Sequence, residues 1–243
     1  MEILIREIIM DAITFQNVSK SFGKVTVLDD MSFSIPQGNL VCLLGPSGSG
    51  KTTIMKLMLG SERPSQGRVS VLGHQLSHKD LYLFGVMPQS DAVYLDLSGY
   101  DNLLFFGKLH KLKDDILKER IHRLAELLDM SHALHHLVST YSGGMKKRLS
   151  LMIALLHDPK VLILDEPTVG IDPILRKKIW KEFRSLQNRG KTLLISTHVM
   201  DEVTYCDHAI LIREGKILAQ DRIETLLKES EGNIETLFLK EGN

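Results

Sequence analysis

Residues 45–52 read Gly45-Pro46-Ser47-Gly48-Ser49-Gly50-Lys51-Thr52, and they match the phosphate-binding pattern G-x-x-x-x-G-K-[ST] at every fixed position. An apolar run at 40–44 precedes them, and a run with helical spacing follows at 54–58. Glycines let successive backbone N–H groups turn toward phosphate oxygens, and the start of a helix adds the positive end of its dipole. A glycine-rich turn with an accidental lysine would not need this strand and helix. The stretch therefore predicts binding of a nucleoside triphosphate.

Two side chains of this loop have predicted roles of their own. Lys51 brings a full positive charge to the β- and γ-phosphates, and the Thr52 hydroxyl is a suitable ligand for Mg²⁺. We expect the bound ATP to contact the whole loop and the start of its helix, namely Gly45, Pro46, Ser47, Gly48, Ser49, Gly50, Lys51, Thr52 and Thr53.

A second apolar run, at 161–164, ends in two carboxylates, Asp165 and Glu166. A buried parallel strand would deliver both to the carboxyl edge of the sheet, where α/β proteins place their ligands. There Asp165 is predicted to hold Mg²⁺, and Glu166 to act as general base on the attacking water. A strand that simply stops at Glu166-Pro167 is the alternative. The phosphate loop upstream favours the catalytic interpretation.

Hydrophobic periodicity predicts an α/β fold. Apolar and polar residues alternate around 13–16, 31–35 and 69–71, which is typical of half-buried antiparallel strands. Continuous apolar runs at 40–44, 161–164 and 193–195 are typical of a parallel sheet covered on both faces. Segments 209–212 and 216–219 flank Glu214-Gly215 and indicate a hairpin. We expect a P-loop NTPase core, with a parallel sheet flanked by helices and an N-terminal antiparallel β subdomain.

Between residues 101 and 136 the period changes to that of helices, and Ser98 followed by Asp101 resembles an N-terminal capping box. No linker or repeat divides the sequence. We therefore expect one domain over 1–243, with the core and β subdomain in 1–90 and 151–243 and a helical subdomain in about 91–150.

Composition is that of an ordinary globular protein, with 243 residues, 43% hydrophobic and 25% charged. Thirty basic residues balance thirty acidic ones, so no global field indicates nucleic-acid binding. Cys42 lies in an apolar run and is interpreted as a core residue of a reducing compartment. Residues 1–10 are too short and interrupted for a signal peptide or membrane span, and we expect an extra strand or a frayed arm there.

Further motifs follow in a set order. Phe22 comes first, then Gln89 in Met-Pro-Gln, then Tyr-Ser-Gly-Gly-Met at 141–145, then Asp172 in Val-Gly-Ile-Asp and His198 in Ser-Thr-His. Residues 141–145 are similar to the LSGGQ signature of the ABC ATPases. Together with the phosphate loop and Asp165-Glu166, the order of these motifs resembles that family over nearly the whole chain.

The resemblance implies a role for each motif residue. Phe22 would stack on adenine, Gln89 would contact Mg²⁺ or water, and His198 would contact the γ-phosphate. Asp172 would belong to the D-loop at the nucleotide. The helical insert would carry the signature, whose Ser142, Gly143 and Gly144 would close on the γ-phosphate held by a second cassette, either an identical chain or a related one. Hydrolysis would then open the dimer. Met145 in place of glutamine, and Tyr141 in place of leucine, depart from the family pattern.

The resemblance also implies partners. A polytopic membrane permease would hold the cassette at the cytoplasmic face of the cell membrane, where the cassette would not touch the cargo and no nucleic acid is expected. Residues 90–100 would offer a docking surface for it, or else pack as an ordinary loop. The motif style, and a chain that ends soon after a helical segment at 223–239, favour export over import. The alternatives are a soluble ABC ATPase, such as one of iron–sulfur assembly, and a small-molecule kinase.

Two clusters are interpreted without a special role. His132, His135 and His136 have the spacing of one helical face, yet no carboxylate or cysteine completes a metal site. The basic triplet at 146–148 lacks the aromatic partners of a nucleic-acid site.

Overall fold

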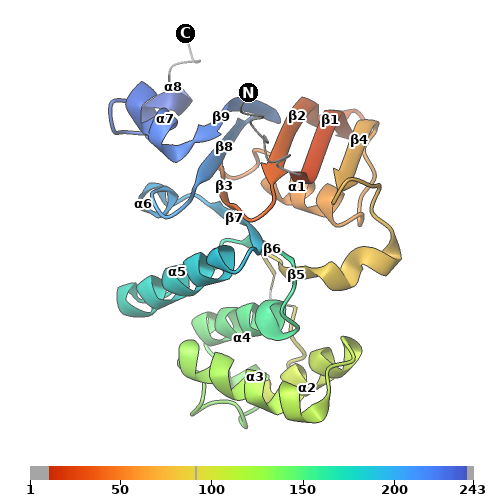
Figure 1. The fold of residues 1–243 in the computed structure, drawn as a ribbon, viewed down its shortest axis with the longest axis vertical. Coiled ribbons are helices and arrows are strands. Elements are labelled where there is room, and N and C mark those ends of the chain that lie inside the picture. The colour runs from red at the N-terminus through yellow and green to blue at the C-terminus, as the bar shows by residue number, and fades with distance from the viewer. Residues whose placement is uncertain (1–10, 91, 240–243) are drawn as a thin grey trace, which may run out of the picture.

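The computed structural model describes residues 11–90 and 92–239, so the strand or arm expected for residues 1–10 lies outside the described residues. Three strands form an antiparallel sheet in the order β2-β1-β4. This sheet lies at one end of the molecule (Figure 1). Its strands are β1 (Asp11–Phe22), β2 (Val25–Pro36) and β4 (Gln66–Val71).

Six further strands form the central sheet in the order β5-β6-β7-β3-β8-β9, parallel except for the last pair. Every residue of β3, β6 and β7 is buried, as their continuous apolar runs predicted. The strands are β3 (Leu40–Leu44), β5 (Phe84–Met87), β6 (Val161–Asp165), β7 (Thr192–Thr197), β8 (His208–Arg213) and β9 (Lys216–Arg222).

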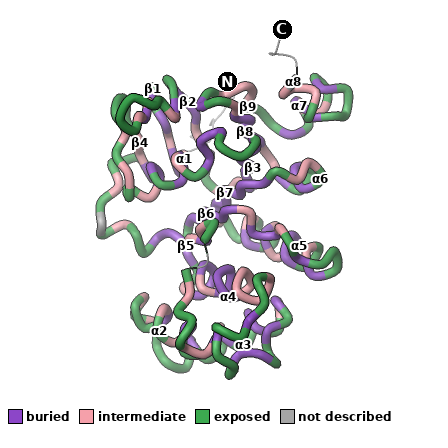
Figure 2. Tube along the Cα trace, turned by 180° about the vertical axis from the view of Figure 1, so that it is seen from behind, coloured by how far each residue is buried: buried purple, intermediate pink, exposed green. Residues whose placement is uncertain are grey.

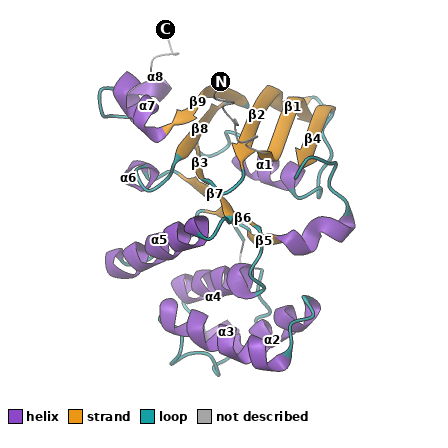
Figure 3. Ribbon diagram, viewed as in Figure 1, coloured by secondary structure: helices purple, strands orange, loops and turns teal. Residues whose placement is uncertain are grey.

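Helices complete the fold (Figure 3). The helices α2, α3 and α4 form a separate layer at the end opposite the antiparallel sheet, as Figure 1 shows. The α-helices are α1 (Lys51–Met58), α2 (Gly99–Leu109), α3 (Asp114–Leu127), α4 (Gly143–Leu156), α5 (Pro173–Asn188), α6 (Met200–Val203), α7 (Ile223–Glu229) and α8 (Glu235–Leu239). Two short 3₁₀ helices are η1 (His78–Leu83) and η2 (Val138–Thr140).

The central sheet separates two hydrophobic clusters. Side chains that alternate along β3 point to opposite faces. Leu40, Cys42 and Leu44 join the cluster beneath α4 and α5, whereas Val41 and Leu43 join the cluster shared with α1 and the antiparallel sheet. Figure 2 shows the resulting buried trace along the strands between the two layers. The predicted parallel sheet flanked by helices, with an antiparallel sheet beside it, is confirmed.

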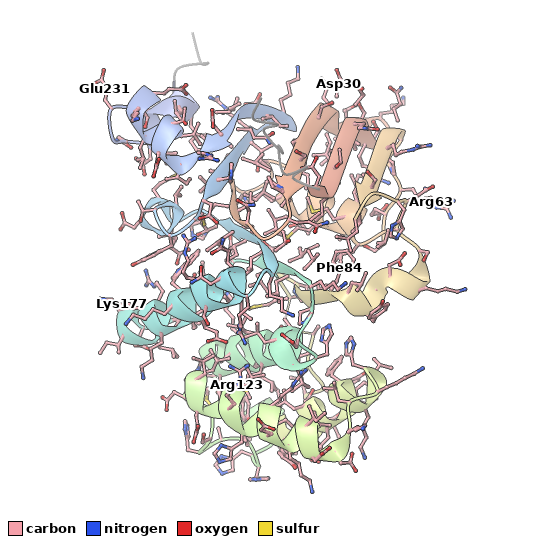
Figure 4. All side chains as sticks on the ribbon, in the orientation of Figure 1. Asp30, Arg63, Phe84, Arg123, Lys177 and Glu231 are labelled. Atoms are coloured by element: carbon pink, nitrogen blue, oxygen red, sulfur yellow. The ribbon has the colours of Figure 1, made fainter. Side chains whose placement is uncertain are left out.

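Local signals are confirmed as well. Ser98 caps α2, because its side chain accepts a hydrogen bond from the Asp101 amide. The β8–β9 hairpin turns at Glu214 and Gly215, whose φ values of 49° and 75° are both positive, as a tight hairpin turn requires. The four-residue strand β5 has no clear counterpart in the sequence pattern. In Figure 4 its Phe84 lies between the layers, while charged side chains such as Lys177 lie at the periphery.

Both cysteines of the chain are buried and free: Cys42 in β3 and Cys206 in the segment between α6 and β8. Burial, followed by the neighbouring Cys42, raises the pKa of the Cys206 thiol well above its usual value. The core position predicted for Cys42 is confirmed. Among the described residues, 11–90 and 92–239, no helix is long and apolar enough to cross a membrane.

Candidate active site

A cavity of about 230 Å³ lies where β3 and β6 end and α1 begins. It brings together three parts of the chain that the sequence analysis singled out separately: the phosphate loop with the start of α1, Gln89 and the carboxylate pair. Val27 of β2 is the one lining residue that the sequence analysis did not name. The lining residues are Val27, Ser47, Gly48, Gly50, Lys51, Thr52, Thr53, Gln89, Asp165 and Glu166.

The backbone of the loop requires glycine at two positions for different reasons. Gly50 has φ 106°, which L side chains rarely adopt, and a β-carbon there would lie 2.5 Å from Cδ2 of Leu28. At Gly45 a β-carbon would lie 2.4 Å from the carbonyl oxygen of Ile212. Gly50 is also the N-cap of α1 and supplies no side-chain cap. The first N–H groups of the helix therefore remain available to an anion.

Lys51 is buried at the first position of α1, and its ammonium group turns back to the loop. Nζ donates to the carbonyl oxygens of Gly45 at 2.6 Å and Pro46 at 2.9 Å. Burial lowers the pKa of Lys51, while the charges of Glu166 and Asp165 act in the opposite direction. The same cavity thus holds one basic side chain and two acidic ones.

Asp165 is the last residue of β6 and is 4% exposed. Its Oδ1 accepts a hydrogen bond from the hydroxyl of Ser196 on β7, and its Oδ2 lies 3.4 Å from the hydroxyl of Thr52. Thr52, Asp165 and Gln89 thus gather oxygen atoms in one cavity, and hard oxygen ligands are those that Mg²⁺ prefers. The side chains present fit the predicted magnesium site.

Glu166 begins the turn after β6 with a φ of 49°, a conformation that costs energy for a residue with a β-carbon. Its amide donates to the carbonyl oxygen of Ser196 at 3.1 Å and to the Ser196 hydroxyl at 3.0 Å. Ser196 therefore holds both carboxylate residues, a role the sequence analysis missed. The available signal was a hydroxyl that follows directly after the apolar run 193–195.

His198 follows β7 and meets Glu166 across the strand ends. Its Nδ1 lies 2.9 Å from Oε1 of Glu166, and its side chain is 53% exposed. Two residues predicted from separate motifs are therefore direct neighbours.

Phe22 lies at the end of β1, beside Val25 across the hairpin turn, and is 46% exposed. Nζ of Lys20 lies 4.6 Å from the centroid of the Phe22 ring. Phe22 is not among the residues that line the cavity, although Val27 of the same hairpin is.

The signature residues lie apart from this cavity. Ser142 is the N-cap of α4, where its hydroxyl accepts from the Met145 amide at 3.2 Å, and Gly143 and Gly144 begin the helix. Figures 1 and 2 both show α4 and α1 in different layers, with the central sheet between them. None of the three residues lines the cavity of its own chain.

Two residues of the predicted motifs have defined structural roles. The hydroxyl of the buried Tyr141 donates to the carbonyl oxygen of Ala133 at 2.6 Å, which supplies the partner that leucine would not need. Asp172 is the N-cap of α5, with Oδ1 accepting from the amides of Ile174 at 3.1 Å and Leu175 at 3.0 Å. The cap could have been predicted from Asp172-Pro173, because proline is favoured at the first position of a helix.

Comparison with known proteins places this geometry in a family. The profile of the family described as ABC transporter matches residues 28–169. The chain belongs to the ABC transporter family. The Nod factor export ATP-binding protein I of Rhizobium johnstonii is 39% identical over 228 residues, covering 91% of this chain and 72% of that protein. ABC transporter G family member 20 of Dictyostelium discoideum is 40% identical over 233 residues, covering 94% of this chain and 32% of that protein.

Solved structures agree with this ABC assignment. cbiO1 from Clostridium perfringens, part of the ABC transporter complex cbiONQ, superposes with a TM-score of 0.78 at 26% identity, covering 96% of each chain. The chain is thus an ABC ATP-binding subunit, which hydrolyses ATP and couples this reaction to transport. The predicted ABC ATPase is confirmed, and the soluble ATPase is not favoured.

Proposed function

We propose that the chain powers an exporter, and that the predicted site residues bind ATP and hydrolyse it. The observation that supports this ATPase site is a single cavity at the start of α1. It is lined by Lys51, Thr52, Gln89, Asp165 and Glu166. The export relative from Rhizobium johnstonii supports the direction of transport.

In this proposal the loop N–H groups and Lys51 bind the triphosphate. Thr52, Asp165 and Gln89 would hold Mg²⁺, which would neutralise phosphate charge. Glu166 accepts a proton from the water that attacks the γ-phosphorus, while the bond to the bridging oxygen breaks and ADP leaves. His198 orients the Glu166 carboxylate through the 2.9 Å contact and faces the γ-phosphate.

The complete site requires a second cassette. Because Ser142, Gly143 and Gly144 lie away from the cavity of their own chain, they would close on the γ-phosphate of the neighbouring copy with the N-terminus of α4. Asp172, which belongs to the D-loop, would lie at the same interface. Phe22 would present its free face to the adenine ring, opposite the face near Lys20.

A polytopic membrane subunit would dock beside the Gln89 segment. Asn102 fixes the backbone of Tyr94 by two hydrogen bonds, at 2.8 Å from its Oδ1 and 3.0 Å from its Nδ2. The side chains nearby are nonetheless exposed, and Tyr94 contacts Phe105 edge-on at 5.1 Å. The exposed apolar side chains of this surface are Tyr94, Leu95, Phe105 and Leu109. Docking there would place the cassette peripherally at the cytoplasmic face of the membrane.

A crosslinking experiment tests the two-cassette site. Ser47→Cys and Ser142→Cys would be combined with Glu166→Gln, so that ATP is bound without rapid turnover. We expect an intermolecular disulfide between positions 47 and 142 that forms with MgATP and not with MgADP. A crosslink that is equally efficient without nucleotide, or none under any condition, would contradict the shared site.

A further inference from the structure

A buried carboxylate lies just behind the catalytic pair. Glu202 belongs to α6 and is 2% exposed. Its Oε1 accepts a hydrogen bond from the hydroxyl of Thr168 at 2.6 Å, and its Oε2 accepts one from the hydroxyl of Thr197 at 2.7 Å. Both threonines are buried, with exposures of 1% and 0%. One side chain therefore holds two separate segments with its two oxygens.

These two segments carry the reacting groups. Thr168 lies two positions after Glu166, in the turn that leaves β6, and Thr197 directly precedes His198 at the end of β7. The Thr197 hydroxyl also accepts a hydrogen bond from the Val199 amide at 3.0 Å, so the turn is held on both sides of His198. Glu202 thus links the Glu166 segment to the His198 segment through the two threonines. The hydrogen bond between Glu166 and His198 links the same two segments directly.

The chemistry of this contact favours a role in geometry. Burying a carboxylate is costly, and the cost is offset only when both oxygens are hydrogen-bonded. Here the two donors are hydroxyls of threonines, whose β-branched side chains have restricted χ1 rotamers. Both bonds have the short length of charge-assisted contacts. An apolar side chain could fill the same space, but it could not fix two hydroxyls relative to one another.

We propose that Glu202 is a positioning residue for ATP hydrolysis, which sets the relative position of Glu166 and His198 through Thr168 and Thr197. The proposal rests on the proposed function, because it assumes that Glu166 is the general base. A misplacement of about 1 Å at a reacting group can reduce a rate about 100-fold, so a clamp on this pair affects turnover far more than binding.

Three variants of the full chain test the clamp: Thr168→Val, Thr197→Val and Glu202→Gln. Valine removes a hydroxyl at nearly constant volume, and glutamine leaves one threonine without its acceptor. For each variant we expect kcat of the ATPase to fall about 10- to 100-fold, with the Kd for MgATP changed less than about threefold. Thr168→Ser and Thr197→Ser, which keep the hydroxyl, should restore kcat to within about threefold of the wild-type value.

Thr192→Val is the matched control. Thr192 is a buried threonine at the opposite end of β7, where its hydroxyl accepts from the Gly38 amide at 3.0 Å. This variant should lower the Tm and leave kcat unchanged, whereas the clamp variants should lower kcat even when their Tm falls no further than that of Thr192→Val. If a valine variant does not fold, the comparison of Glu202→Gln with Thr192→Val gives the same answer.

The kcat of the double variant Thr168→Val/Glu202→Gln should lie within about threefold of the kcat of the slower single variant, because both changes remove the same contact. Unchanged kcat in all three single variants, or a loss equal to that of Thr192→Val at equal Tm, would overturn the positioning role. Glu166→Gln separates the two proposals. If that variant has the wild-type kcat, the assignment of Glu166 as general base is wrong. If its kcat is low while the variants of Thr168, Thr197 and Glu202 keep the wild-type kcat, only the positioning role of Glu202 is wrong.

Discussion

Nδ1 of His198 lies 2.9 Å from Oε1 of Glu166, although the two residues are 32 positions apart in the chain. They meet because β6 and β7 are parallel neighbours that end at the same edge of the sheet. The pairing of Asp165 with Ser196 in this register leaves Glu166 and His198 just beyond the strands. The proposed catalytic pair is therefore brought together by the register of β6 and β7.

Glu166→Gln should remove the general base without disturbing the turn, because glutamine has the same shape and tolerates the same φ of 49° equally well. We expect kcat to fall by about 10²- to 10⁴-fold while MgATP is still bound. Steady-state phosphate release measures the first effect, and size-exclusion chromatography with ATP measures the accumulated closed dimer. Wild-type turnover in this variant would reject Glu166 as the base.

Lys51→Ala should strongly weaken ATP binding, because it removes the basic side chain that the loop holds in the same cavity as the carboxylates. The loss of a charge-assisted contact worth about 1.5–3 kcal/mol corresponds to a rise in the Kd for MgATP of about 10- to 100-fold. Lys56→Ala, on the exposed face of the same helix, is the control and should bind normally. Equal affinity of the Lys51 variant and the wild type in a titration would disprove this interpretation of the loop.

Gly99→Ala should destabilise the helical layer beside the signature. A β-carbon at Gly99 would lie 2.3 Å from the Tyr141 hydroxyl, an overlap that costs about 1–3 kcal/mol. Tyr141→Phe leaves the Ala133 carbonyl without its 2.6 Å donor, at about 1–2 kcal/mol. Since the second change removes the atom that causes the first clash, the double variant should be about as stable as Tyr141→Phe alone. Urea unfolding measures all four proteins, and strictly additive losses would contradict the overlap.

His157 should make the fold sensitive to acid. Burial, then the charge of His110, lowers the pKa of His157 to about 4 from 6.5. His157 is therefore protonated at a lower pH in the folded state than in the unfolded state. The stability that the neutral His157 contributes is lost as the pH falls from 6.5 to 4. Allowing for the partial exposure of the ring, the loss is on the order of 2 kcal/mol.

His157→Gln keeps a side-chain donor for the Phe84 carbonyl, which Nε2 of His157 contacts at 3.0 Å. The Tm of this variant, measured by circular dichroism, should therefore depend less on pH in this window. His122→Gln, at an exposed position on α3, should follow the wild type. An identical pH dependence in all three proteins would exclude His157 as the source.

Much of the fold could be predicted because most of the longer elements carry a local signal of their own. The glycines and Lys51 define the phosphate loop, and continuous apolar runs define β3, β6 and β7. The short elements β5 and α6 carry too few residues for a period to appear. The hydroxyl of Ser196 and the carboxylate of Glu202 have their roles only through partners that the sheet brings near. The apolar run before Ser196 could indicate its position at the end of a strand, but no local pattern could assign the partners of either residue.

The burial of Cys42 and Cys206 has a practical consequence for spectroscopy on this cassette. A thiol reacts with maleimides as the thiolate, and Cys206 is both shielded from solvent and held in the protonated form by its raised pKa. A fluorophore or spin label should therefore attach selectively at a cysteine introduced on the surface of the native chain. Distances between the helical layer and the central sheet can then be followed through the nucleotide cycle without first replacing either natural cysteine.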